Sequence, residues 1–118
     1  MNLNLNVLVR LMLLNNLPEQ GNLEKMLNKR NVRNKISFSS EELDKLNLKT
    51  NENGIIWNPI DDVSVEFTDT EIKFINDIIV DIDNKGLINE GLLDFIFAVR
   101  SRLENIDKET ENKENNND

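Results

Sequence analysis

The apolar residues of the chain recur with helical spacing near both ends and alternate with polar residues in the middle. The first apolar segment, residues 7–16, follows Asn6 as a capping residue and ends before Pro18 and Gly21. It is apolar on nearly every side. Such a helix is either enclosed by its own domain or buried against a second copy of the chain, so a homodimer is one of the two possibilities.

Two more helices are expected before residue 47. Asn22 can cap a helix that ends near Asn34. We expect its buried stripe to contain Leu23, Met26 and Leu27. Ser39 and Glu42 have the spacing of a capping box, in which each side chain accepts a hydrogen bond from the other residue's backbone N–H group. This box predicts a short third helix that carries Leu43 and Leu46.

The middle of the chain has the pattern of short strands. Residues 48–57 contain an Asn53–Gly54 pair, which favours the tight turn of a β-hairpin. Residues 63–67 then alternate between apolar and polar side chains, as a strand with one buried face does. The pattern therefore predicts a small three-stranded antiparallel sheet.

The C-terminal half predicts a helical hairpin. Thr68 and Glu71 form a second capping-box pattern, and an isoleucine stripe follows at helical spacing. Gly86 is expected to end this helix in a left-handed conformation, and Asn89 to cap the last one. The fold class is therefore α+β and predominantly helical. We expect one globular domain over residues 1–106 and a disordered acidic tail over residues 107–118.

The amino-acid composition disfavours catalysis. The chain contains no histidine, cysteine or tyrosine. Histidine is the commonest general base at neutral pH, and cysteine supplies thiolate nucleophiles and metal ligands. We therefore expect no enzyme activity, no cofactor and no metal site, and a protein that acts by binding.

One segment deserves a test for calcium binding. Residues 81–89 resemble the first part of an EF-hand loop, with Asp81, Asp83 and Gly86 at the first, third and sixth positions. The fifth position is Lys85, a cation where an oxygen ligand belongs, and the twelfth is Leu92 in place of a bidentate carboxylate. No ion is expected here, because a helix end followed by a cap accounts for the same residues.

The net charge of −8 is unevenly distributed. Residues 1–40 carry six basic and two acidic side chains, whereas residues 41–118 carry eight basic and twenty acidic ones. An acidic surface steers association with a basic partner; the plainer alternative is a surface that contacts only water. Candidate contacts for a basic cleft on another protein are Asp69, Asp77, Asp81, Asp83, Glu90 and Asp94.

The second predicted helix has a basic face, which supports a different hypothesis. The expected order of helices followed by a hairpin is similar to that of a winged-helix domain, which inserts one helix into the DNA major groove. The candidate nucleic-acid contacts are Lys25, Lys29, Arg30, Arg33 and Lys35. The acidic remainder of the chain and the single Lys49 near the hairpin turn disfavour nucleic acid as a partner. These cations can instead pair with the protein's own carboxylates.

Four stretches together resemble small, functionally uncharacterised proteins of bacteriophages and prophages: Asn6–Leu14, Leu17–Asn22, Ile36–Glu42 and Ile55–Asn58. The likeness covers most of residues 5–97. It implies a viral accessory protein, and short acidic phage proteins often block a host defence system by stoichiometric binding, as anti-CRISPR proteins do.

The leading expectation is therefore a phage-encoded, non-enzymatic protein that binds and inhibits a host protein, for example one that handles nucleic acid in defence. The alternative is a small winged-helix-like DNA-binding regulator. The start of the chain has no basic segment followed by a long apolar run, so we expect no secretory signal, no membrane span and a location in the host cytoplasm.

Overall fold

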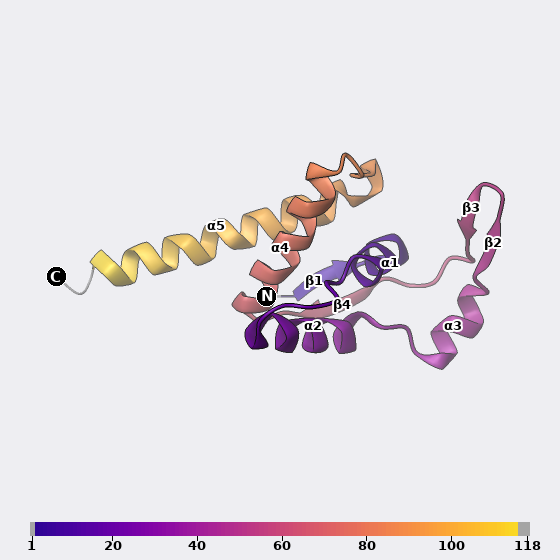
Figure 1. Cartoon of the computed structure of the whole chain (residues 1–118), viewed down its shortest axis with the longest axis horizontal. Coiled ribbons are helices and arrows are strands. Elements are labelled where there is room, and N and C mark those ends of the chain that lie inside the picture. The colour runs from indigo at the N-terminus through magenta and orange to yellow at the C-terminus, as the bar shows by residue number, and fades with distance from the viewer. Residues whose placement is uncertain (1, 116–118) are drawn as a thin grey trace.

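The computed structural model describes residues 2–115, with side chains as far as residue 108. It is an α+β fold in which helices predominate, as the sequence pattern predicted. The elements, in chain order (Figure 1), are β1 (Asn2–Leu5), α1 (Val7–Asn15), α2 (Leu23–Ile36), α3 (Ser40–Leu46), β2 (Lys49–Asn51), β3 (Gly54–Ile56), β4 (Val63–Glu66), α4 (Asp69–Asn84), the short 3-10 helix η1 (Glu90–Leu92) and α5 (Leu93–Asn115).

The strands form two separate two-stranded antiparallel sheets, so the predicted three-stranded sheet is wrong. β4 pairs with β1 at the start of the chain, with Leu5 opposite Val63, while β2 and β3 pair only with each other. Asparagine and leucine alternate in β1, which buries Leu3 and Leu5 and leaves the asparagines exposed. The sheet of β1 and β4 therefore has one face in the core, whereas every residue of β2 and β3 is exposed.

The first helix is enclosed by its own domain. Asn6 caps α1 by accepting a hydrogen bond from the backbone N–H of Val9 at 2.9 Å. Val9 and Leu13 are buried in the main core, and Leu8, Met12 and Leu14 pack against that core while partly exposed. In the structure, α1 is therefore packed into the core of its own chain, which was the first of the two possibilities.

The second helix buries a different stripe from the one predicted. Val32 and Ile36, near its C-terminal end, are completely buried. Leu23 is 77% exposed and Leu27 is 41% exposed, so the predicted buried stripe is wrong for these two residues. The buried residues of α2 lie in its C-terminal half, whereas Leu23 and Leu27 lie in its first turns on a side that the described chain leaves exposed.

The C-terminal helices form the predicted hairpin. The capping box of Thr68 and Glu71 is present at the start of α4. At its end Gly86 has a φ of 70°, and the N–H of Leu87 donates to the carbonyl oxygen of Ile82 at 3.0 Å, which is the hydrogen bond of a left-handed helix stop. Asn89 caps η1, and α5 follows directly.

α5 is longer than the sequence suggested. It continues as a helix to Asn115, whereas a disordered tail was expected from residue 107; residues 116–118 lie outside the described residues. Glu and Lys, which dominate this segment, are strong helix formers. A helix already nucleated by packing can extend through such residues at little cost.

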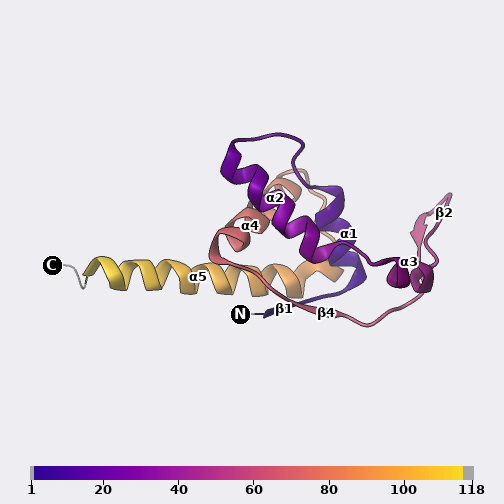
Figure 2. The same cartoon turned by 90° about the horizontal axis from the view of Figure 1, so that it is seen from below.

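The molecule consists of a body and a projecting arm. We call residues 39–58, which contain α3, β2 and β3, the arm, and the remaining described residues the body. The main core draws on β1, α1, α2, α4, η1 and α5, together with Phe67, and includes no arm residue. Figures 1 and 2 show the arm standing away at one end, opposite the end at which α5 projects.

Arg10 fixes the arm to the body. Its side chain is only 3% exposed, and its Nη1 and Nη2 atoms donate to the two carboxylate oxygens of Glu42 at 2.6 and 3.0 Å. Its Nε and Nη2 atoms also donate to the carbonyl oxygens of Ile36 and Ser37, each at 2.9 Å, and its guanidinium lies 4.0 Å from the ring centre of Phe38. The hydrogen bonds from Arg10 lower the pKa of Glu42 to about 2. The contact therefore joins α1, the end of α2 and the start of α3.

Candidate protein-binding groove

The structure does not bring the six predicted acidic residues onto one face. Asp77 and Asp81 line the same hollow beside α2. Asp83 lines a different hollow between α4 and α5, and Asp94 lines a third one beside β1. A helical turn explains part of this separation, because Asp83 is two residues after Asp81 and so points to the opposite side of α4.

The other two carboxylates also lie apart from the first pair. Asp69, at the start of α4, accepts a hydrogen bond from Arg102 of α5 at 2.6 Å. Glu90 is exposed in η1. The predicted acidic surface is therefore a set of separate positions, and only Asp77 and Asp81 stand together at a concave site.

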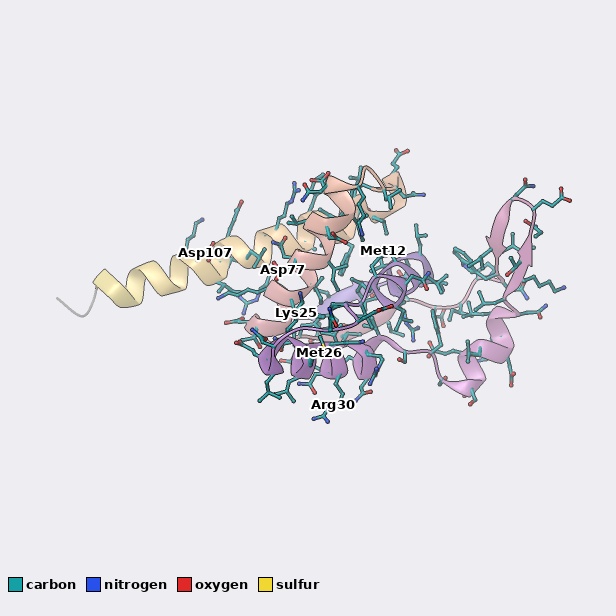
Figure 3. The ribbon with its side chains drawn as sticks, in the orientation of Figure 1. Met12, Lys25, Met26, Arg30, Asp77 and Asp107 are labelled. Atoms are coloured by element: carbon teal, nitrogen blue, oxygen red, sulfur yellow. The ribbon has the colours of Figure 1, made fainter. Side chains whose placement is uncertain are left out.

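That concave site is a groove between α2 and α4. Two hollows of about 360 and 320 Å³ share Lys25, Phe74 and Asp77 as lining residues. Asn16 and Pro18, in the connection between α1 and α2, complete one wall of the larger hollow. Figure 3 shows Lys25 and Asp77 on the two helices that border the groove.

The local sequence explains how the groove acquires an apolar floor beside charged groups. Phe74 and Ile78 are one turn apart on α4, and both are 5% exposed in the core. Asp77 and Asp81 form a second pair with the same spacing on the adjacent strip of the helix and are exposed. The floor is thus the outer edge of the core, and the carboxylates mark its border with water.

The start of α2 supplies the opposite wall. Asn22 caps this helix, accepting from the backbone N–H of Lys25 at 2.8 Å. Gly21 lies directly below the Lys25 side chain, since a Cβ atom added at Gly21 would come within 2.6 Å of Lys25 Cδ. The glycine therefore leaves the space in which the Lys25 side chain lies beside the groove.

The charged groups of the groove are only partly paired. Lys85 Nζ donates to Asp81 Oδ2 at 2.9 Å, but both side chains are more than half exposed, so this pair is weak and easily exchanged. Within the described residues, no ion pair involves Asp77, Lys25 or Lys73. The groove therefore offers an open carboxylate next to an apolar floor.

The predicted basic residues of α2 fall into two groups. Lys35 is taken up within the fold, because its Nζ atom donates to Glu71 Oε1 at 2.5 Å and to the carbonyl oxygen of Glu66 at 2.9 Å. The other four cations form no ion pair among the described residues: Lys25, Lys29, Arg30 and Arg33. Pairing with the protein's own carboxylates thus accounts for Lys35 alone.

The hairpin that would serve as the wing of a winged helix is distant from these cations. β2 and β3 lie in the arm, beyond α3, at one end of the molecule, while α2 lies along the body (Figures 1 and 2). Lys25 faces the α4 groove. The basic residues and the hairpin therefore do not form one continuous surface.

The segment that resembles an EF-hand loop forms the C-terminal end of α4 and the turn that follows it. Lys85, at the position where a ligand oxygen belongs, binds the carboxylate of Asp81. Among the described residues, no group of three or more carboxylates is arranged to hold a metal ion. Among the helices of residues 2–115, none combines the length and the apolar character needed to cross a membrane.

Sequence reasoning found Asp77, Asp81 and Lys25 but assigned the lysine to a different site. It did not identify Phe74 or Pro18 as part of a site. No protein-family model, curated protein or solved structure matches the chain. The chemistry of the groove itself is therefore the basis for a functional proposal.

Proposed function

We propose that this protein acts by binding a segment of another protein in the groove between α2 and α4, and that it is not an enzyme. The observation that carries the proposal is the unpaired carboxylate of Asp77 beside the apolar floor of Phe74 and Ile78. Such a floor provides hydrophobic contact, and the carboxylates provide orientation and selectivity.

The chemistry of the chain supports a binding role over catalysis. Every buried side-chain nitrogen or oxygen atom in the described residues has a hydrogen-bond partner. The two ion pairs that have one buried member, Arg10 with Glu42 and Lys35 with Glu71, are each held by further hydrogen bonds within the fold. These groups are therefore committed to the structure and are not poised to react.

The groove favours a particular class of partner segment. An apolar side chain would lie on Phe74 and Ile78, and lysine or arginine residues beside it would approach Asp77 and Asp81. Because the negative potential also extends over the acidic C-terminal half, association with a basic partner should be fast at low salt and slower as salt screens it.

The partner in this proposal is a host protein with a basic cleft: a segment beside that cleft binds in the groove, and the acidic protein then covers the cleft and inhibits the partner. Two features support this extension: the acidic excess of residues 41–118 and the resemblance to small phage proteins. A cleft that normally binds nucleic acid would be blocked by stoichiometric binding of an acidic protein.

Nucleic-acid binding is the second candidate, and one observation favours it. Lys29, Arg30 and Arg33 lie close together along α2 and form no ion pair in the described residues. Clustered free cations are what phosphate contact requires. The acidic remainder of the chain opposes it, so this candidate ranks second.

A titration followed by amide NMR separates these candidates. A short peptide of alternating lysine and leucine is added to the full chain, and a peptide of glutamate and leucine is the matched control. The proposal predicts shifts at Lys25, Phe74 and Asp77 with the basic peptide alone. Shifts elsewhere, or none, would contradict it. Duplex DNA at low salt is added separately; shifts confined to Arg30 and Arg33 would favour the second candidate.

A further inference from the structure

A second surface, separate from the groove, lies where α4 and α5 join. Four large apolar side chains are exposed there: Val80 at 47%, Leu87 at 62%, Leu93 at 36% and Phe97 at 56%. Leu93 and Phe97 also line a hollow of about 160 Å³ between the two helices. Scattered single exposed apolar residues are ordinary, but Leu93 and Phe97 border the same hollow, and neighbouring exposed apolar side chains mark an interaction surface.

The spacing of these residues is that of a helix prepared to pack against another. Leu93, Phe97 and Arg100 follow one another at four and three residues along α5, so they form one stripe. Val80 and Asp83 stand on the neighbouring side of α4, which contacts α5 directly. The exposure of Val80, Leu93 and Phe97 shows that no other described segment fully covers these side chains.

The charges at this surface are matched to one another. Asp83 of α4 and Arg100 of α5 both line the hollow, and neither forms an ion pair in the described residues. In a dimer with two-fold symmetry, the same patch meets itself, so residue i contacts residue j and j contacts i. A patch with one anion and one cation beside an apolar centre is complementary to its own copy.

We infer that the tip of the α4–α5 hairpin binds a second copy of this chain. Phe97 and Leu93 of one copy pack against those of the other, and Asp83 of each copy faces Arg100 of its partner. The two hairpins then form a four-helix arrangement of the kind that buries such stripes. This inference uses a different surface from the groove and does not depend on the proposed function.

Sedimentation velocity of the full chain tests the inference. A 13.7 kDa chain is expected to sediment as a dimer at tens of micromolar, because an interface anchored by buried aromatic side chains commonly reaches micromolar affinity or better. Phe97→Asp is expected to raise the dimer dissociation constant by about tenfold or more. Leu23→Asp introduces the same chemistry at a more exposed leucine on α2 and should leave the dimer intact.

A charge exchange identifies the partner as a second copy. Asp83→Arg and Arg100→Asp should each weaken the dimer, since each places like charges opposite one another. The double variant should restore it, because the complementary pairs are rebuilt with reversed sign. Circular dichroism verifies that each variant is folded. A monomeric wild-type chain, a Phe97→Asp variant that remains a dimer, or a double variant weaker than both single ones would overturn the inference.

Discussion

Arg10 shows how a single side chain can determine the position of a whole segment. Its guanidinium serves a carboxylate of α3 and two carbonyl oxygens at the end of α2 at the same time. The arm contributes no residue to the main core, so hydrophobic packing alone does not fix it there. A buried charge that satisfies three partners is costly to remove, because all three partners then lose a charged donor.

We expect Arg10→Met to lower the free energy of unfolding by about 3 kcal/mol or more, the usual cost of removing one member of a buried ion pair. Urea denaturation measures this directly. Lys45→Met is the matched control, because it removes a lysine from an ion pair whose side chains are 65% and 79% exposed. A similar loss in both variants would mean that Arg10 acts only as a surface charge.

The same contact predicts a pH dependence with a defined sign. The hydrogen bonds from Arg10 lower the pKa of Glu42 from its ordinary value of 4.5 to about 2 in the folded protein. A carboxyl group whose pKa falls on folding stabilises the protein fully above its unfolded pKa, and this contribution is lost as the pH falls toward the folded pKa. The window is therefore about pH 4.5 down to 2.

Urea unfolding at a series of pH values tests this expectation. The wild-type chain should lose stability between pH 4.5 and 2 more steeply than Glu42→Gln, which has no carboxylate to protonate there. Glu41→Gln, one residue away and not bonded to Arg10, is the matched control. Equal slopes for wild type and Glu42→Gln would contradict the assignment.

At the scale of the elements, β1 is a short strand with a large role. It covers only Asn2–Leu5, yet Leu5 is completely buried and Leu3 is 5% exposed. β1 contacts both β4 and α5, so it joins the middle of the chain to the C-terminal helix. Residues 2–5 are thus part of the folded body.

Leu5→Ala should therefore destabilise the protein by about 2–5 kcal/mol, the range for deleting a fully buried leucine side chain. Asn2→Ala, on the exposed side of the same strand, should change stability by less than about 0.5 kcal/mol. Thermal or urea unfolding measures both. Equal and small effects would show that β1 does not pack in solution as it does in the structure.

The arm should be the least stable ordered segment of the described chain. Its hairpin has strands of three residues with no buried side chain, and an isolated two-stranded hairpin is marginally stable. Local opening of such a segment requires little free energy. In amide hydrogen exchange, residues 49–56 should exchange much faster than Ile75 and Ile79 of α4. Equal protection would place the hairpin in the same cooperative unit as the core.

The sequence predicted the elements whose stabilising contacts lie close together along the chain, and it missed those whose contacts are distant. The capping boxes at Ser39 and Thr68 were predictable because all of their partners lie within three residues. β1 was missed although its residues alternate regularly, because its partner β4 lies some sixty residues further along the chain. Nothing in the sequence near Leu23 and Leu27 indicates that the buried residues of α2 are Val32 and Ile36 in its other half.

The candidate site followed the same rule. Asp77 and Asp81 could be predicted as neighbours because they are one turn apart on a well-defined helix. The groove could not, since it forms where the connection before α2 packs beside α4 and brings Pro18 near Phe74. Lys25 was identified by its charge, but its place opposite Asp77 depends on the way the helices cross.

At the scale of the whole molecule, charge and shape separate into distinct surfaces. The free cations Lys29, Arg30 and Arg33 lie along α2. The groove that contains Asp77 and Asp81 lies between α2 and α4, and exposed apolar side chains lie at the α4–α5 tip. The three surfaces lie on different parts of the body. Binding a partner in the groove and pairing two copies at the tip are therefore geometrically compatible, and each can be altered without the other.

The groove is proposed to bind a basic protein partner, and the most direct test is quantitative capture of proteins from a lysate of the proposed host. Wild type is compared with Asp77→Lys/Asp81→Lys and with Glu52→Lys/Glu90→Lys, which makes the same change in net charge away from the groove. We predict a captured protein that is released by added salt, lost with the first variant and retained with the second. Equal capture by wild type and Asp77→Lys/Asp81→Lys would contradict the claim.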